Sequence, residues 1–189
     1  MVTAEARQKL ADIIYRRSFG RGEVTLASGK KSDYYFDMKP SMLDPQGAAT
    51  IAAMMHRHVV ASGAEWVGGL ELGAVPITGS LVAVSIAEGK PLHGFIMRKK
   101  QKEHGARKHI EGLAAGESLK GKKVAILEDV TTTGGSAAQV IEECRAQGAV
   151  VTLVLSIVDR GEGAEEFFEA QGVRFEALFK ADEFRARRD

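Results

Sequence analysis

The feature that most constrains the fold is an alternation of short apolar strands and helices between residues 65 and 179. The predicted strands are rich in Val, Ile and Leu, and they cover residues 65–70, 92–97, 124–127, 149–158 and 173–179. The predicted helices cover residues 76–87 and 136–147, and a short third one contains Phe167 and Phe168. This order is typical of an α/β fold with a central parallel sheet flanked by helices. Such sheets bind ligands at the carboxyl ends of their strands.

The chain ahead of residue 65 has a different pattern. It begins with an amphipathic helix, after which two short strand-like runs between Glu23 and Asp37 flank a Ser-Gly turn. These runs predict a small hairpin. Asp44 and Pro45 then supply a helix cap and a first-turn proline, so a further helix is expected as far as Gly63.

Length and composition limit the possible classes of protein. The 189 residues predict a single domain over residues 1–189, and 44% hydrophobic with 27% charged residues excludes disorder of the whole chain. The formal net charge of +1 attracts neither nucleic acid nor a membrane surface. No apolar run approaches the ~20 residues of a membrane span. Together with the lone Cys144, this predicts a cytoplasmic protein with no nucleic-acid or membrane partner.

The segment after the predicted strand 124–127 has the composition of a phosphate site. Its glycines allow backbone N–H groups to approach an anion, its hydroxyls add donors, and the following helix contributes a positive N-terminus. Neither a Walker A lysine nor a Gly-x-Gly-x-x-Gly spacing is present. An alternative is a glycine-rich turn with acidic caps. The segment reads Glu128, Asp129, Val130, Thr131, Thr132, Thr133, Gly134, Gly135 and Ser136.

The two carboxylates favour the phosphate site over the simple turn. Adjacent acids beside a phosphate would repel it unless they have another task. Glu128 and Asp129 are suited to holding ribose hydroxyls or a hydrated divalent cation. The predicted ligand is therefore a ribose phosphate.

A strongly basic segment covers residues 98–109. It contains six Lys or Arg, two His and one Glu, which gives a formal charge of +5. By itself such a segment is as easily explained as a solvated charged loop. Beside a phosphoribose site it predicts a lid whose cations meet the charge of a leaving pyrophosphate.

These motifs resemble a known family. The segment 124–136 resembles the phosphoribosylpyrophosphate (PRPP) signature of type I phosphoribosyltransferases. Arg-Lys-x-x-Lys-x-His-Gly at 98–105 and Thr-Leu-x-Ser-Gly to Tyr-Tyr-Phe-Asp at 25–37 resemble orotate phosphoribosyltransferase. Residues 68–76 and the pair Asp159-Arg160 extend the match.

The resemblance implies a fold and a reaction. The expected fold is the type I phosphoribosyltransferase fold, a parallel-sheet core with a small hood formed mainly by residues 20–40. The expected reaction transfers phosphoribose from PRPP to orotate, giving orotidine 5′-monophosphate and pyrophosphate in de novo pyrimidine (UMP) biosynthesis. Mg²⁺ is the implied cofactor, carried by PRPP and bridged by water to Asp129, with no direct protein ligand. A homodimer is also implied, in which the mobile loop Arg98 to Gly112 reaches the neighbouring active site.

The resemblance also implies roles for single residues. Lys102 and Asp129 correspond to catalytic positions, and the pyrophosphate is expected to contact Arg98, Lys99, Lys102 and His104. Glu128 and Asp129 are expected to bind the ribose hydroxyls. The remaining PRPP contacts are expected from Val130, Thr131, Thr132, Thr133, Gly134, Gly135 and Ser136, and the orotate contacts from Thr132 and Arg160. A planar guanidinium suits the orotate carboxylate, which it can hold in a bidentate pair.

Two departures and two alternatives accompany this interpretation. Well-known members carry lysines where Ala27 and Gly73 stand, and Lys30 or Lys100 are candidates for compensating charge. One alternative is a purine phosphoribosyltransferase, although Arg160 suits an acidic pyrimidine better. The other is a PRPP-sensing regulator that binds nucleic acid, although the chain is net acidic outside residues 98–109.

Overall fold

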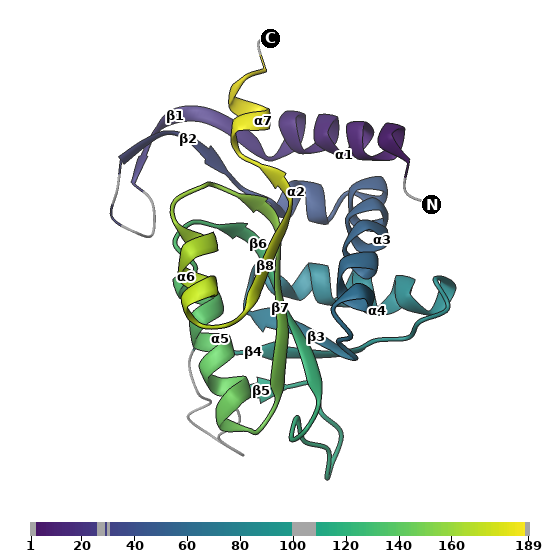
Figure 1. Ribbon diagram of the computed structural model, residues 1–189. Coiled ribbons are helices and arrows are strands. Elements are labelled where there is room, and N and C mark those ends of the chain that lie inside the picture. The colour runs from purple at the N-terminus through teal and green to yellow at the C-terminus, as the bar shows by residue number, and fades with distance from the viewer. Residues whose placement is uncertain (1–2, 26–28, 30, 100–108, 188–189) are drawn as a thin grey trace.

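The protein folds into a six-stranded sheet and a separate two-stranded hairpin (Figure 1). The structure is a computed structural model that describes residues 3–25, 29, 31–99 and 109–187. The strands are β1 (Phe19–Thr25), β2 (Lys31–Phe36), β3 (Trp66–Leu70), β4 (His93–Met97), β5 (Ile110–Glu111), β6 (Lys123–Thr131), β7 (Val150–Asp159) and β8 (Arg174–Lys180). The helices are α1 (Ala4–Arg17), α2 (Lys39–Met42), α3 (Pro45–Ala61), α4 (Ala74–Ala87), α5 (Gly135–Ala146), α6 (Ala164–Ala170) and α7 (Asp182–Arg185).

The large sheet has the strand order β5-β4-β3-β6-β7-β8. Its pairs are parallel except for the edge strand β5, which is antiparallel to β4. The predicted α/β fold with a central parallel sheet is therefore confirmed. The sequence did not indicate β5, because a two-residue strand has no periodicity to detect. Ile110 is nevertheless 2% exposed, so this part of the predicted loop 98–112 is anchored in the core.

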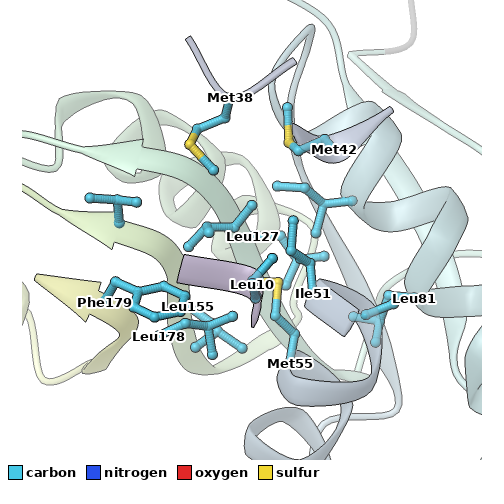
Figure 2. Close-up of a cluster of buried hydrophobic side chains, with 14 of the residues drawn as sticks. Leu10, Met38, Met42, Ile51, Met55, Leu81, Leu127, Leu155, Leu178 and Phe179 are labelled. Carbon is cyan, nitrogen blue, oxygen red and sulfur yellow. The ribbon is translucent and has the colours of Figure 1, made fainter. Parts of the chain in front are cut away.

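Helices cover both faces of the sheet (Figure 1). Strand β6 shows how the faces divide, because Ala125 and Leu127 pack with α1, α3 and α4, whereas Val124 and Ile126 pack with α5 and α6. Successive residues of a strand point to opposite faces, so a fully apolar strand fills two cores at once. Figure 2 shows the first core, in which Leu10, Ile51 and Leu81 meet Leu127 and Leu155 of the sheet. No helix in the described part of the chain is long and apolar enough to cross a membrane.

The predicted cap of α3 is confirmed. The Asp44 carboxylate accepts hydrogen bonds from the backbone N–H groups of Gln46 and Gly47 at 3.1 and 2.9 Å, and Pro45 follows it. These bonds satisfy donors that the first turn of a helix leaves free. The helix then runs along the sheet face with Ile51 and Met55 buried.

The hairpin β1-β2 lies within the predicted hood, residues 20–40, and packs on the C-terminal helix α7. Strands β1 and β2 pair in antiparallel fashion from Phe19 opposite Phe36. Both rings lie near Phe184 of α7, with centroids 6.3 and 5.4 Å away. The hairpin was predicted from local pattern, but this contact joins segments from opposite ends of the chain, so no local pattern shows it.

Strand β6 is longer than predicted, and this corrects the placement of the two carboxylates. The sequence predicts a strand that ends at Leu127 and a loop that begins at Glu128. Instead β6 continues to Thr131, with Glu128 opposite Ser156 and Thr131 opposite Asp159. The reason is the partner, since β7 extends to Asp159 and its ladder holds the polar residues of β6 in strand conformation. Glu128 therefore lies within a strand that is paired with β7.

Candidate active site

A cavity of about 270 Å³ lies where the strand order reverses. The chain proceeds from β3 outward to β4 and then returns to place β6 on the other side of β3. The connections that leave the carboxyl ends of β3 and β6 diverge there, which is the usual ligand position in such sheets. We call this space the switch-point cavity. Its lining comprises Lys39, Leu70, Glu71, Leu72, Gly73, Ala74, Lys99, Glu128, Asp129 and Ser136.

Glu128 and Asp129 bring two buried carboxyl groups to this cavity. Glu128 is 9% exposed, and its Oε1 has no hydrogen-bond partner among the described residues. Burial, together with the neighbouring charge of Asp129, raises the pKa of Glu128 to about 8, whereas Lys99 opposes the shift. Burial also raises the pKa of Asp129, although the Val130 N–H donates to its Oδ1 at 2.9 Å. A buried carboxylate oxygen without a hydrogen-bond partner is a candidate for binding a ligand.

The loop after β6 leads into an uncapped helix N-terminus. Gly134 precedes α5 with φ of 88°, and a Cβ atom there would lie 2.7 Å from Cζ of Phe168. Only glycine fits both this conformation and this close approach. No described side chain caps the first turn of α5, and Ser136 in that turn lines the cavity. Free N–H groups and the helix dipole make such a terminus a site for anions.

The predicted phosphate-binding residues do not share one environment. Thr133, Gly135 and Ser136 are exposed, whereas Thr132 is half-buried. Thr131 is 2% exposed, and its hydroxyl has no hydrogen-bond partner within the described ranges. All of them nevertheless lie between the end of β6 and the first turn of α5.

The basic segment is only partly described. Lys99 lines the switch-point cavity, and its backbone N–H donates to Oε1 of Glu71 at 2.9 Å. The Arg98 side chain instead lies 3.5 Å from the carboxylate of Glu111 on β5. The predicted catalytic Lys102 and the predicted pyrophosphate contact His104 lie outside the described residues. So do Ala27, Lys30 and Lys100.

Arg160 lies beyond the end of β7 and contacts the hood. Its side chain is 3% exposed, with Nε donating to Glu162 at 2.7 Å and Nη2 donating to the Ser32 hydroxyl at 3.0 Å. The guanidinium carbon lies 4.1 Å from the centre of the Tyr34 ring. These bonds use two of the five donors of an arginine, and no described residue accepts a hydrogen bond from the other three, which suit a carboxylate. The backbone N–H of Arg160 donates to Thr131, next to Thr132, which brings the two predicted orotate contacts close together.

A second cavity, of about 470 Å³, lies between the hairpin and the C-terminal helix. Arg160 belongs to its wall, and its other charged residues are mixed in sign. The lining comprises Glu23, Lys31, Ser32, Asp33, Tyr34, Arg160, Glu162 and Arg185.

Three residues of the site were not singled out in the sequence. Lys39 and Glu71 line the switch-point cavity, and Glu162 orients Arg160. The available signal for Glu162 was its place two residues after the Asp159-Arg160 pair. Glu71 lies within the matched segment 68–76 but carries no role there, Lys39 follows the motif that ends at Asp37, and only the folded chain brings both beside Asp129.

Gly73 explains why the loop after β3 approaches so closely. It precedes α4, and a Cβ atom built on it would lie 2.7 Å from Oδ1 of Asp129. A side chain at this position would therefore displace the carboxylate or the loop. With glycine there, the loop lies directly against the carboxyl group of Asp129.

Comparison with known proteins identifies the family. An orotate phosphoribosyltransferase of Rhodopseudomonas palustris (strain TIE-1) is 54% identical over 184 residues, which span 97% of this chain and 98% of that protein. The chain belongs to the orotate phosphoribosyltransferase family. A member from Nostoc sp. is 41% identical, over 92% of this chain and 82% of its own length. No protein-family model matches the chain.

Solved structures of the family agree with the fold. A crystal structure of Mycobacterium tuberculosis orotate phosphoribosyltransferase has a TM-score of 0.81 at 34% identity and covers 95% of this chain and 98% of that one. The same enzyme in complex with PRPP has a TM-score of 0.77 at 32% identity, with the same coverage. The predicted type I fold and the predicted function in pyrimidine biosynthesis are confirmed. The purine-specific and regulatory alternatives are not favoured.

Proposed function

We propose that the switch-point cavity binds PRPP and that orotate, held near Arg160, receives its phosphoribosyl group. The bond between ribose C1 and a pyrophosphate oxygen breaks, a bond between C1 and a ring nitrogen of orotate forms, and the proton of that nitrogen is released with the pyrophosphate. The observation that carries this assignment is the pair of buried carboxyl groups, Glu128 and Asp129, next to the uncapped start of α5. Carboxylates hold ribose hydroxyls, and the helix terminus holds a phosphate.

The 5′-phosphate of PRPP is assigned to the start of α5. Thr132, Thr133 and Ser136 supply hydroxyl donors there, and Gly134 and Gly135 supply backbone N–H groups. The Thr131 hydroxyl, which has no partner within the described ranges, supplies another donor. Val130 contributes through its backbone, which already orients Asp129.

Orotate is assigned to the guanidinium of Arg160 with the help of Thr132. Ser32 and Glu162 hold the guanidinium at two of its N–H groups, and Tyr34 lies under its plane. This leaves one edge of the fork for the orotate carboxylate in a charge-assisted pair. A side chain whose orientation is held before binding loses less entropy when the ligand arrives.

The leaving pyrophosphate is assigned to the basic segment. Lys99 is already at the cavity, and the side chain of Arg98 lies 3.5 Å from the carboxylate of Glu111. We assign Lys102 as the catalytic lysine, with His104 as a further pyrophosphate contact. Cations that meet charge as it develops lower the barrier rather than merely tightening binding.

Mg²⁺ fits this site as a cation that arrives with PRPP. The donors at the cavity are carboxylate oxygens, which suit Mg²⁺, and Oε1 of Glu128 lacks a partner in the described chain. Asp129 would hold the hydrated ion through water, and the bound ion would neutralise pyrophosphate charge. We also propose a cytoplasmic homodimer in which the loop Arg98 to Gly112 serves the neighbouring active site.

A base-selection assay tests the proposed reaction. The protein is incubated with PRPP and Mg²⁺ and with orotate, adenine, hypoxanthine or guanine in separate reactions. We expect consumption of orotate alone, with equal amounts of orotidine 5′-monophosphate and pyrophosphate formed. Omitting Mg²⁺ should stop the reaction. Consumption of a purine while orotate stays untouched would overturn the assignment.

A further inference from the structure

The charge of the switch-point cavity is unusual for a site that receives an anion. The described lining contains three acids, Glu71, Glu128 and Asp129, and two cations, Lys39 and Lys99. PRPP is highly anionic, so each cation at this cavity matters for its binding. No cation can enter from position 73 without disturbing Asp129, because of the 2.7 Å approach described above.

The backbone on both sides of Lys39 is anchored in the core. Met38 is 1% exposed and Met42 2% exposed, and Figure 2 shows both side chains above the cluster that contains Leu127. Ser41 is fully buried and shares a hydrogen bond of 2.7 Å with Ser18. Buried neighbours on both sides hold the backbone in place, so the Cα atom of Lys39 has a fixed position at the rim of the cavity.

The Lys39 side chain itself is available to a ligand. Its Nζ pairs with Oδ1 of Asp37 at 2.5 Å, and the two side chains are 54% and 47% exposed. An exposed ion pair of this kind is weak. Lys39 also interacts electrostatically with Asp129, since it lowers the pKa of that carboxyl group. Lys39 therefore offers a positive charge at the cavity, and its weak ion pair with Asp37 allows it to contact a bound phosphate.

We propose that Lys39 is a PRPP-binding residue that contributes a positive charge from the hood to the pyrophosphate of PRPP. The pyrophosphate is the part concerned because Lys39 shares the cavity with Lys99 and with the loop at Gly73. Asp37 holds the lysine in the free chain and shares it with the ligand after binding. The inference rests on the proposed function, since it names a further contact in the same site.

The test compares Lys39→Met with a matched control. Lys123→Met removes an exposed lysine from the start of β6, at the opposite end of the strand from the cavity. Binding of PRPP with Mg²⁺ is measured by calorimetry, without any base. Loss of a charge-assisted contact should weaken PRPP binding about tenfold or more in Lys39→Met, and Lys123→Met should match the wild type. Lys39→Arg should recover most of the lost affinity.

Two further measurements separate binding from a structural role. Asp37→Asn breaks the same ion pair but keeps the lysine, so it should bind PRPP as well as the wild type or better. If Lys39 served only to pair with Asp37, both variants would weaken binding equally, which would overturn the proposal. Inorganic pyrophosphate should lose affinity for Lys39→Met, whereas ribose 5-phosphate should not. The reverse pattern would overturn the assignment to pyrophosphate.

The outcome is distinguishable from failure of the proposed reaction. If the wild type consumes no orotate but binds PRPP, the reaction assignment fails, and the binding comparison still tests Lys39. If the wild type is active and Lys39→Met binds PRPP normally, the inference about Lys39 fails by itself. In a successful outcome, the KM for PRPP rises while the KM for orotate stays unchanged.

Discussion

Replacing Glu128 by glutamine should change how PRPP binding depends on pH. Burial raises the pKa of Glu128 to about 8, so only about 1% of the groups are ionised at pH 6 and about half at pH 8. If the ionised carboxylate accepts the ribose hydroxyls, the apparent Kd for PRPP is weakened by the fraction of competent protein, and binding should tighten about 50-fold between pH 6 and pH 8 in the wild type.

The measurement is a calorimetric titration of PRPP with Mg²⁺ at several pH values in the wild type and in Glu128→Gln. A glutamine side chain keeps the size of glutamate but cannot ionise, so the variant reports the titration of PRPP itself and of Asp129. The difference between the two pH profiles gives the contribution of the Glu128 carboxylate to PRPP binding. Profiles that run parallel from pH 6 to pH 8, in variants with unchanged fold, would refute the role of the ionised carboxylate.

The same group predicts a change in the stability of the free chain. Folding raises the pKa of Glu128 above its ordinary 4.5, so the folded chain retains a proton that the unfolded chain releases. The free energy of unfolding should therefore fall as pH rises from about 4.5 to about 8. Glu128→Gln lacks this loss, and its melting temperature relative to the wild type should rise across that range.

The remaining predictions concern orotate binding at Arg160, the glycine turn before α5, and the action of the basic loop on the neighbouring subunit. Arg160→Ala should abolish orotate use at a cost of about 2 to 5 kcal/mol in orotate binding, and separate titrations should show PRPP binding intact. Gly134→Ala should lower the free energy of unfolding in urea by more than Gly116→Ala, because both have positive φ but only Gly134 faces a close contact. Mixed dimers of inactive Lys102→Ala and Asp129→Asn chains should recover about a quarter of wild-type activity if the loop serves its neighbour. No recovery, with subunit exchange confirmed by mass spectrometry, would refute the shared site.

The local parts of the fold were predictable from the sequence because their causes are local. Asp44 and Pro45 start α3 through bonds to residues two and three positions away. The apolar strands need both faces covered, and this requirement predicts the parallel sheet with helices on each side. The end of β6 was not predictable, because it depends on the length of its partner β7.

The candidate site was predictable only where one segment carries its chemistry. Glu128 and Asp129 stand beside the glycine loop in the chain, so their relation to a phosphate site follows from adjacency. Lys39 reaches the same cavity from a helix much earlier in the chain, and no spacing rule connects the two. The raised pKa of Glu128 also depends on burial, which the sequence does not show.

Arg160 shows how one side chain joins the hood to the six-stranded sheet. Its backbone N–H bonds to the end of β6, while its guanidinium bonds to Ser32 on β2, 128 residues away. The Tyr34 ring beneath the guanidinium belongs to the same aromatic cluster that fixes the hairpin on α7. An orotate carboxylate bound to the free edge of this guanidinium would therefore add a contact to a group that both parts already hold. In the proposed function, base binding and the position of the hood would therefore depend on the same residue.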